Sequence, residues 1–286
     1  MPEGDSVLVA GRRLHAALAG QRVVRSDLRV PAFATSDLSG QLLREVAARG
    51  KHLLFRTDGG LTLHTHFRME GEWHLYRPGG RWKGPSHEVR AVLETAPWVA
   101  VGFRLGIVEL LPTLREAEVL AYLGPDVLGA DWDPDEAVRR LGLDPDREIG
   151  AALIDQRVMA GPGNVYKSEA CFLRGLDPWM RVGDVSDLEG LVGLVKRLME
   201  ANRTTGMQIT TGDRRAGHGR WVYGRGGRPC RRCGTPVRRR APGVDGDPGS
   251  ETYERVTYWC PSCQPSRPIR SRRTWPGGAA GRDAAD

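Results

Sequence analysis

The stretch Cys230-Arg231-Arg232-Cys233, followed 26 residues later by Cys260-Pro261-Ser262-Cys263, decides the fold of the C-terminal part of the chain. Two C-x-x-C pairs supply four thiolates, the ligand set of a tetrahedral structural Zn²⁺. The spacer exceeds the usual zinc-ribbon range, but its middle, 241–250, is rich in Gly, Pro and Asp and can form a hairpin tip. We therefore predict one structural zinc ion in a zinc-finger β-hairpin.

Positive charge is concentrated around these cysteines. Between Arg214 and Arg273 the chain holds 15 Arg, no Lys and four acidic residues, whereas all 286 residues together carry a net charge of only +7. An excess of Arg in one segment indicates a polyanionic partner, above all nucleic acid. A solvated basic tail explains the charge alone equally well. After Gln264 the Pro, Ser, Arg and Gly content predicts a disordered tail, 265–286.

The segment before the basic region, 114–206, is predicted to be helical. Apolar periodicity predicts helices over 114–123, 135–141, 149–156, 165–173 and 188–202. Between the third and the fourth, Gly161-Pro162-Gly163-Asn164 predicts a tight turn with Asn164 as the N-cap. Amides at such a turn, with a helix N-terminus behind them, form a phosphate site. Taken alone, this segment favours an ordinary αα-hairpin over a phosphate site.

The N-terminal part, 1–113, is predicted to be a β-sandwich capped by one helix. Val7, Gly11, Leu14 and Leu18 fall on one helical stripe, and Gly20 follows it. Short β-like runs separated by Gly-rich turns come next. They span 23–30, 42–47, 52–56, 61–66, 73–77, 89–93, 99–103 and 107–111. The chain is thus expected to be of the α+β class, with a β-sandwich domain (1–113), a helical domain (114–206), and a linker and zinc finger (207–264).

Membrane and secreted classes are not favoured by the composition. No apolar run reaches the roughly 18 residues of a membrane helix, and Glu3 and Asp5 make the N-terminus unlike a basic signal peptide. Cys171, alone in a predicted helix, is expected to be a small buried residue. We expect a cytoplasmic monomer without membrane contact.

The N-terminus carries candidate chemistry. Removal of Met1 leaves Pro2 with a free secondary amine, and an α-amino group has a pKa near 8. Such an amine can attack C1′ of a sugar and give an iminium, which favours elimination. Glu3 beside it is a candidate proton donor. Lys51 and Lys167 are two of only four lysines, so they are candidates for roles that Arg cannot fill.

These segments together resemble one known family. Pro2-Glu3-Gly4, Arg49-Gly50-Lys51-His52, Gly161 to Tyr166 and the finger from Tyr223 to Gln264 occur in the order typical of the formamidopyrimidine-DNA glycosylase/endonuclease VIII family. The resemblance covers about residues 1–264. It implies a β-sandwich, a helix–two-turn–helix module and a zinc finger with damaged double-stranded DNA between them. It also implies base excision followed by strand cleavage through β- and δ-elimination.

The resemblance assigns roles to matching residues. Pro2 matches the Schiff-base nucleophile, Glu3 the essential acid, and Lys51 a lysine that contacts phosphate and assists proton transfer. Gly163 and Asn164 match the phosphate-binding turn, and Arg255 matches a finger arginine that grips phosphates and takes part in δ-elimination. Phosphate contacts set affinity more than specificity.

The stretch His66-Phe67-Arg68-Met69-Glu70-Gly71 resembles the family's void-filling loop. Met69 would enter the gap left by a flipped base, with Arg68 near the backbone. A core-filling role is the alternative for Met69.

Departures from the guanine-lesion branch favour the endonuclease VIII branch. The opening Pro2-Glu3-Gly4-Asp5-Ser6 is closer to endonuclease VIII, Arg104-Leu105-Gly106 lacks the aromatic residue of the guanine-lesion branch, and the stretch 206–221 is short for the lesion-capping loop of that branch. The chain also departs from endonuclease VIII, because the second glutamate expected near Ser6 is absent and Tyr122 stands where an arginine contacts DNA. We therefore expect oxidised pyrimidines rather than 8-oxoguanine as substrates. Two alternatives stay open: a non-catalytic zinc-ribbon nucleic-acid-binding protein, and a family member acting only on abasic or single-stranded DNA.

Overall fold

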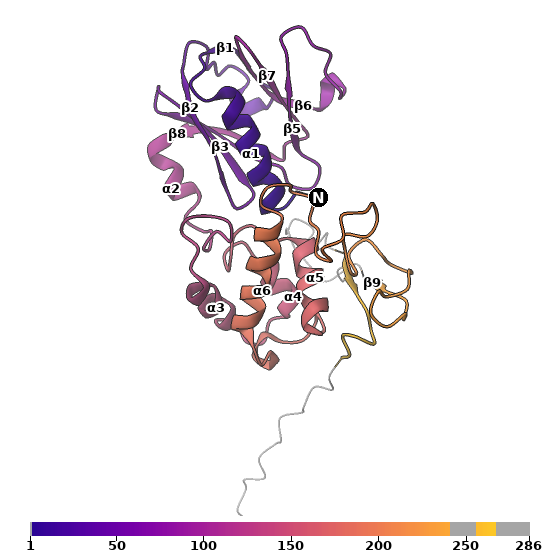
Figure 1. Cartoon of the computed structure of the whole chain (residues 1–286). Coiled ribbons are helices and arrows are strands. Elements are labelled where there is room, and N and C mark those ends of the chain that lie inside the picture. The colour runs from indigo at the N-terminus through magenta and orange to yellow at the C-terminus, as the bar shows by residue number, and fades with distance from the viewer. Residues whose placement is uncertain (1, 241–255, 267–286) are drawn as a thin grey trace, which may run out of the picture.

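The computed structural model describes residues 2–240 and 256–266 (Figure 1). Two packed β-sheets and the helix α1 form one end of the molecule, a group of helices forms the other, and a small finger lies beside these helices (Figure 1). The predicted α+β class, with a sandwich, a helical part and a cysteine finger, is confirmed. The division of the chain at residues 113, 206 and 264 stays a prediction.

All eight strands predicted for the sandwich are present, within a few residues of the expected bounds. They are β1 (Val23–Leu28), β2 (Leu43–Arg49), β3 (His52–Thr57), β4 (Leu61–His66), β5 (Glu72–Tyr76), β6 (Val89–Thr95), β7 (Val99–Phe103) and β8 (Ile107–Pro112). They form two four-stranded sheets, β1-β6-β7-β5 and β2-β3-β4-β8, in which the paired neighbours are antiparallel.

The sandwich core is built from alternate residues of each strand, as the pleat of a strand requires. Leu53, Phe55 and Leu63 face the core together with Val7 and Leu14 of α1 (Gly4–Leu18). The predicted apolar stripe of this helix is therefore its buried face. The opposite face of the sheet β2-β3-β4-β8 is covered by the segment that leads into the helical part, and this places the two parts in contact.

The helices of the second part are close to their predicted positions. They are α2 (Glu116–Val119), α3 (Pro134–Gly142), α4 (Ile149–Ile154), α5 (Asn164–Arg174) and α6 (Leu188–Ala201), with 3-10 turns η1 (Pro31–Phe33), η2 (Ser86–Glu88), η3 (Thr113–Arg115) and η4 (Val182–Asp184) elsewhere. The helix predicted over 114–123 is wrong in length, because Leu120 and Leu123 leave the helix to pack against Leu54 and Ala160.

The finger is a short antiparallel pair of strands, β9 (Arg238–Arg240) and β10 (Thr257–Trp259). Its core joins Val222 and Val237 to Phe172 of α5, so the finger is attached to the helical part by apolar contacts. Residues 241–250, predicted to form the hairpin tip, lie outside the described residues, as does nearly all of the predicted tail. Among the described residues, none of the helices has the length and apolar character needed to cross a bilayer.

Candidate active site

Glu3 is fully buried, and its carboxylate binds the start of α5. The amides of Gly163 and Tyr166 donate to Oε2 (2.7 and 3.4 Å), and the amide of Val165 donates to Oε1 (2.7 Å). The positive end of a helix dipole favours such an anion. A Cβ on Gly163 would lie 2.6 Å from Cδ of Glu3, so only glycine allows this approach. The predicted anion site at this turn therefore holds an anionic side chain of the same molecule.

Pro2 lies at the edge of an open cavity of about 410 Å³. Its position follows from Glu3 and from the amide of Gly4, which donates to the carbonyl of Gly161 (2.9 Å). Residues from both parts of the molecule surround the cavity, among them Ser6, Phe67, Met69, Met207 and Arg220. Pro2, which is expected to carry a secondary amine, thus borders a space large enough for a nucleobase.

Asp5 supplies a second buried carboxyl group next to Glu3. Its Oδ2 accepts a hydrogen bond from the hydroxyl of Tyr166 (2.8 Å), and its Oδ1 has no partner within the described residues. Burial raises the pKa of Asp5 to about 6, and the charge of Glu3 adds to this effect. Ser6, where the family has a second glutamate, instead exchanges hydrogen bonds with the backbone of Glu3. The second carboxyl group of this chain thus lies at Asp5, bound to Tyr166, and not at position 6.

Lys51 is nearly buried and lies at the tip of the β2–β3 hairpin. Gly50 adopts φ +55°, and its amide donates to Oδ2 of Asp126 (2.7 Å). A Cβ atom on Gly50 would lie 3.0 Å from Cβ of Ala160. Glycine at this position therefore allows the hairpin to pack against the turn before α5. The structure therefore brings the Lys51 segment to the turn that also binds Glu3.

The predicted void-filling loop follows β4 and borders the cavity of Pro2. Met69 is 38% exposed, so the alternative of a core residue is wrong. Arg68 adopts φ +50°, and its side chain lies against Gly106, where a Cβ would be 2.4 Å from Cγ and Cδ of Arg68. Arg104 also has a positive φ, and its guanidinium binds Glu72 (2.9 Å) and Glu88 (2.6 Å). Two strained arginines thus shape this loop.

Asn164 is the first residue of α5, and Gly163 is its N-cap, so the prediction of Asn164 as the N-cap is wrong. The carboxylate of Glu3 already satisfies the amides that an Asn N-cap would bind. The side-chain amide of Asn164 instead donates to the carbonyl of Val256 (2.7 Å), and Nζ of Lys167 donates to Oγ1 of Thr257 (2.7 Å). Both residues therefore join α5 to the finger. Arg255, the neighbouring candidate, lies outside the described residues.

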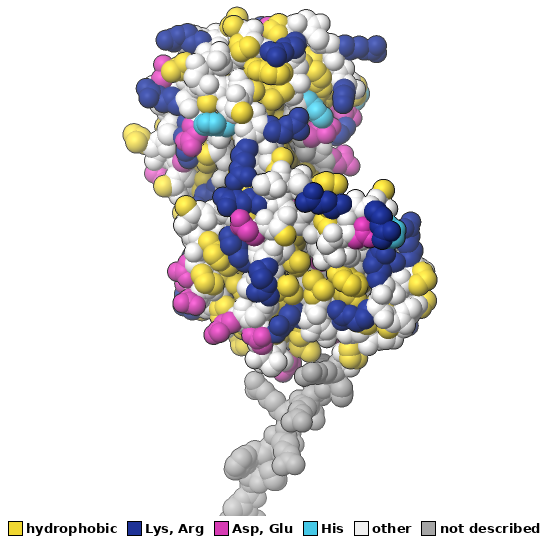
Figure 2. Space-filling model, viewed as in Figure 1, with side chains coloured by type: hydrophobic (Ala, Val, Ile, Leu, Met, Phe, Trp, Pro, Cys, Tyr) yellow, Lys and Arg dark blue, Asp and Glu magenta, His cyan; other side chains and the backbone are white. Residues whose placement is uncertain are grey.

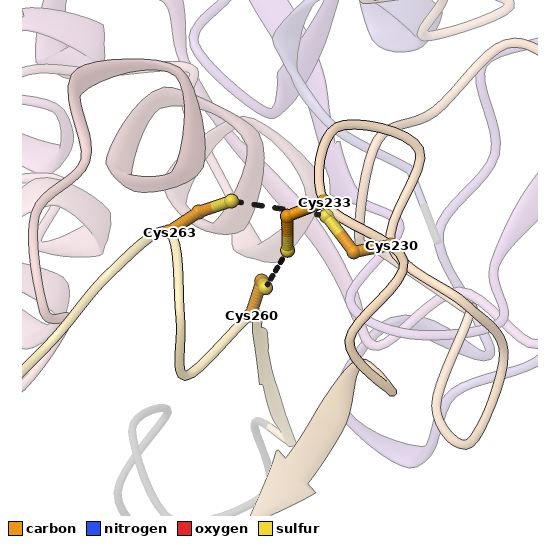
Figure 3. A group of neighbouring side chains, drawn as sticks. All are labelled: Cys230, Cys233, Cys260 and Cys263. Carbon is orange, nitrogen blue, oxygen red and sulfur yellow. Dashed lines mark hydrogen bonds between the residues drawn. The ribbon is translucent and has the colours of Figure 1, made fainter.

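The four finger cysteines converge on one point (Figure 3). Their Sγ atoms all lie within 4.8 Å of one another, with Cys233 and Cys260 at 3.4 Å and Cys230 and Cys263 at 4.0 Å. Tetrahedral thiolates about 2.3 Å from zinc would be about 3.8 Å apart. The four residues therefore fit a metal ion of this kind. Cys171 is buried, as predicted, and is not a member of this group.

Basic side chains are numerous on the face shown in Figure 2, including the zone where the sandwich meets the helical part. A second cavity, of about 330 Å³, adjoins that of Pro2 through Met207, Gln208 and Arg220. Its walls include five arginines: Arg214, Arg215, Arg220, Arg225 and Arg228. This concentration of positive charge beside the candidate site favours a polyanionic ligand.

Comparisons with known proteins agree with this arrangement. Residues 1–105 match the family described as "Formamidopyrimidine-DNA glycosylase N-terminal domain". The "Probable endonuclease 8 2" of Streptomyces coelicolor is 50% identical, with 98% of each chain covered. The chain belongs to the formamidopyrimidine-DNA glycosylase/endonuclease VIII family. The "DNA-(apurinic or apyrimidinic site) lyase Nei2" of Mycolicibacterium smegmatis is 47% identical over 92% of this chain and 99% of its own.

Solved structures show the same family fold. The formamidopyrimidine-DNA glycosylase of Lactococcus lactis, bound to DNA with an abasic site, superimposes with a TM-score of 0.76. It covers 92% of this chain and 100% of its own at 22% identity. The relatives of high identity carry endonuclease 8 names, so this family member lies on the endonuclease VIII side, as predicted.

Two buried hydrogen-bonded groups near the candidate site were not identified from the sequence. One is the buried Asp5–Tyr166 pair. The other is Glu169, fully buried on α5, whose carboxylate accepts hydrogen bonds from the amides of Trp221, Val222 and Tyr223 (2.8–2.9 Å) and from the hydroxyl of Thr210. Glu169 thereby holds the linker that carries the finger. An acidic residue on the apolar face of a predicted helix was the available signal.

Proposed function

We propose that this protein is a bifunctional DNA glycosylase and abasic-site lyase of base-excision repair. The observation that carries the proposal is the placement of Pro2: Glu3, bound to three amides of α5, holds the N-terminus at the cavity that Met69 borders. Membership of the family and the names of its close relatives support the same activity. A non-catalytic zinc-ribbon protein would not require this N-terminal arrangement.

Pro2 acts as the nucleophile once Met1 is removed. Its nitrogen forms a bond to C1′ of the damaged nucleotide while the glycosidic bond breaks, and the electron pair of that bond leaves with the base. The nitrogen then loses its proton to solvent, and its lone pair breaks the C1′–O4′ bond while O4′ takes up a proton. The product is an open-chain iminium without an N–H proton. The iminium withdraws electrons from C2′, so loss of a C2′ proton breaks the 3′ C–O bond, and a further elimination breaks the 5′ C–O bond.

Glu3 and Lys51 are the proton-transfer groups in this scheme. Departure of the base requires a proton on the base or on the sugar oxygen, and Glu3 is the acid adjacent to Pro2. Lys51, held by Gly50 against the turn at Ala160, contacts a phosphate and assists proton transfer. Arg255 grips phosphates around the flipped nucleotide and takes part in δ-elimination. The turn at Gly163 and Asn164 would bind the DNA backbone only if Asn164 exchanges the carbonyl of Val256 for a phosphate oxygen, since the amide of Gly163 is held by Glu3. Met69 occupies the gap left by the flipped base, with Arg68 near the backbone.

The metal of the finger is proposed to be zinc with a structural role. Cys230, Cys233, Cys260 and Cys263 would hold it, and four thiolates leave no open position for an activated water. When bound, zinc would supply folding free energy to the finger and no reaction step. The finger would then be held in contact with Asn164 and Lys167 of α5. Because genomic DNA is the proposed substrate, we expect the protein to act inside the cell as a monomer.

Oxidised pyrimidines are the proposed lesions. Leu105, which stands where the guanine-lesion branch has an aromatic residue, is a buried member of the sandwich core and cannot wedge beside an orphan base. The guanidinium of Arg104 is bound by two carboxylates. Neither residue is therefore placed to read the base opposite a damaged guanine.

A second candidate function is strand cleavage at abasic sites without base excision. The name of the relative from Mycolicibacterium smegmatis, an abasic-site lyase, favours it. All the residues named above for the lyase step would serve it equally well. It differs from the first function only in the step that needs an acid to release the base.

A panel of duplexes separates these functions. Each duplex carries one lesion (thymine glycol, dihydrouracil, 8-oxoguanine or a preformed abasic site) and is incubated with processed protein, with and without borohydride. We expect cleavage and a reducible covalent adduct with the pyrimidine lesions and with the abasic site. Cleavage of the abasic duplex alone would favour the lyase-only function. Absence of any adduct, with intact DNA binding, would exclude both.

A further inference from the structure

Arg220 places a positive charge in the wall of the cavity that Pro2 borders. This cavity and the neighbouring arginine-lined cavity share three residues, Met207, Gln208 and Arg220. Arg220 is the charged residue among the three, and it is half-buried. A guanidinium keeps its proton at every pH at which proteins are folded. The space that the proposed function assigns to a flipped base is therefore bordered by a permanent cation.

The guanidinium of Arg220 is held by groups that do not neutralise it. Its Nη2 donates to Oε1 of Gln208 (2.9 Å), and its Cζ lies 5.1 Å from the ring centroid of Tyr223. Within the described part of the chain Arg220 forms no ion pair, and the nearby Asp213 is paired with Arg215 and His218. An amide oxygen and an aromatic ring orient a guanidinium without cancelling its charge. That charge is therefore available to a ligand in the cavity.

Both partners of the hydrogen bond between Gln208 and Arg220 lie on a constrained backbone. Gln208 is buried and adopts a left-handed φ of +56°. The side chain of Asn202 binds both the amide and the carbonyl of Ile209 (2.7 and 2.8 Å). The carbonyl of Arg220 accepts a hydrogen bond from Nε of Arg231 (3.0 Å). The position of the guanidinium is thus set before DNA binds, which is the condition for electrostatic catalysis without reorganisation.

The neighbouring cavity adds to the positive potential at Arg220. Of its five arginines, Arg215 is the one that the described residues pair with a carboxylate, that of Asp213 (2.6 Å). Burial, followed by the charges of neighbouring arginines, lowers the pKa of Arg225. Like charges therefore lie close together here, and an anion beside Arg220 relieves their repulsion.

The excision step proposed above produces such an anion. As the nitrogen of Pro2 forms its bond to C1′, the bond between C1′ and N1 of the pyrimidine breaks. Its electron pair moves onto N1 and, by conjugation, onto the carbonyl oxygen O2. The base leaves as an anion and afterwards takes up a proton from solvent. Before this step O2 is a neutral carbonyl oxygen, so a guanidinium beside it interacts more strongly in the transition state than in the ground state.

We propose that Arg220 contacts the flipped pyrimidine at O2 and stabilises the negative charge of the departing base. The inference rests on the proposed function, since it presupposes that the base occupies the cavity of Pro2. A base stabilised in this way needs no proton, which leaves the sugar oxygen as the atom that Glu3 protonates. The role of Arg220 is confined to base release, because an abasic site has no base whose charge could be stabilised.

The test compares bases that differ as leaving groups. The anion of dihydrouracil is confined to N1 and the carbonyl at C2, because C5 and C6 are saturated, whereas the anion of 5-hydroxyuracil also extends to O4. Single-turnover rates are measured with saturating processed protein on a duplex with each lesion and on an abasic duplex. We expect Arg220→Gln to slow release of dihydrouracil about 10²–10³-fold and of 5-hydroxyuracil roughly tenfold. Cleavage of the abasic duplex should change by less than about threefold, which also shows that the variant is folded.

Two further variants separate charge from structure. Arg220→Lys keeps the positive charge, so we expect it to recover part of the rate on dihydrouracil, which the loss of a purely structural contact would not allow. The matched control is Arg197→Gln, which removes an exposed arginine of α6 and should leave all three rates unchanged.

The outcomes that overturn the inference are distinct from those that overturn the proposed function. An equal loss for Arg220→Gln on the two lesions, an equal loss on all three duplexes, or no loss refutes the role of Arg220. Weaker binding with a smaller salt slope and unchanged saturated rates would place Arg220 on a phosphate and also refutes it. If the unmodified protein releases neither base but cleaves the abasic duplex, base excision itself is refuted, and the inference with it.

Discussion

Replacement of Glu3 by Gln tests the proposed acid and the geometry of the N-terminus together. The substitution keeps the size of the side chain but leaves one oxygen to accept hydrogen bonds. In the structure both carboxylate oxygens are used, by the amides of Gly163, Val165 and Tyr166. The NH₂ group of Gln would therefore face at least one amide N–H, and two donors would meet in a fully buried position.

The cost to stability follows from these contacts. A hydrogen bond to a charged group contributes about 1.5–3 kcal/mol, and a buried donor left without an acceptor costs about 1–3 kcal/mol. We expect Glu3→Gln to lower the free energy of unfolding by roughly 2–4 kcal/mol. For a chain of this length this corresponds to a fall in Tm of about 4–16 °C. Base release should fall by about 10²–10⁴-fold, the usual contribution of a general acid.

The assay compares two substrates at a temperature well below both melting transitions. Single-turnover cleavage of a thymine glycol duplex reports base release plus strand cleavage, and a preformed abasic duplex reports strand cleavage alone. The matched control is Glu169→Gln. Glu169 is equally buried and also accepts from three backbone amides, but it holds the finger linker rather than Pro2. We expect Glu3→Gln to slow the lesion duplex far more than the abasic duplex, and Glu169→Gln to weaken both in proportion.

A proportional loss on both substrates for Glu3→Gln would refute the role of Glu3 as the acid for base release. It would leave a purely positional role, in which Glu3 fixes Pro2 by capping α5. Full activity of Glu3→Gln on the lesion duplex would refute both roles.

Further perturbations address the other parts of the molecule. Burial raises the pKa of Asp5 from 3.8 to about 6, so the carboxyl group favours folding below pH 4 and loses that contribution as the pH rises through 6. Asp5→Asn should therefore raise the free energy of unfolding at pH 7 by up to about 3 kcal/mol, and by little at pH 4. Urea unfolding at the two pH values measures this difference. Cys260→Ser should abolish the binding of one zinc ion per chain, measured by elemental analysis, and weaken duplex binding; tight binding with full activity would exclude the structural site. Arg255→Ala should lower the slope of log K against log salt by about one, equally for damaged and undamaged duplexes, and an unchanged slope would show that Arg255 does not contact phosphate. An N-terminal extension that blocks Pro2 should abolish borohydride trapping without loss of duplex binding, whereas Pro2→Gly should retain part of the trapping. If mass spectrometry maps the adduct to a lysine, the nucleophile is a residue other than Pro2.

The sandwich was largely predictable because its signals are local. Alternation of apolar residues, as in Leu53 and Phe55, and Gly-rich turns specify strands without knowledge of their partners. The cysteine finger was predictable for the same reason, since two C-x-x-C pairs define the ligands. The short length of α2 was not predictable. Leu120 and Leu123 fit a helical pattern locally, but in the folded protein they leave the helix and bury their side chains against Leu54 of the sandwich.

The contacts that connect the candidate site residues could not be predicted from the sequence. Asn164 satisfies the sequence rule for an N-cap, and that rule assumes that no other acceptor reaches the helix amides. Glu3 does reach them from 160 residues away, and it removes the need for a cap at Gly163. No local sequence pattern predicts such a contact, because its strength depends on the burial of Glu3 by both parts of the molecule.

This long-range cap has a consequence for how the activity depends on folding. The position of Pro2 is set by Glu3, and Glu3 is set by the N-terminus of α5, whose far side packs against the finger through Phe172. The sandwich alone contains Pro2, Glu3 and Lys51 but not the amides that orient them. Loss of the packing around α5 therefore removes the amide donors that bind Glu3 and leaves its carboxylate unpaired. The proposed nucleophile Pro2 is thus in place only when the sandwich and the helical part are folded together, so we expect reactivity at the N-terminus to depend on the folding of both parts.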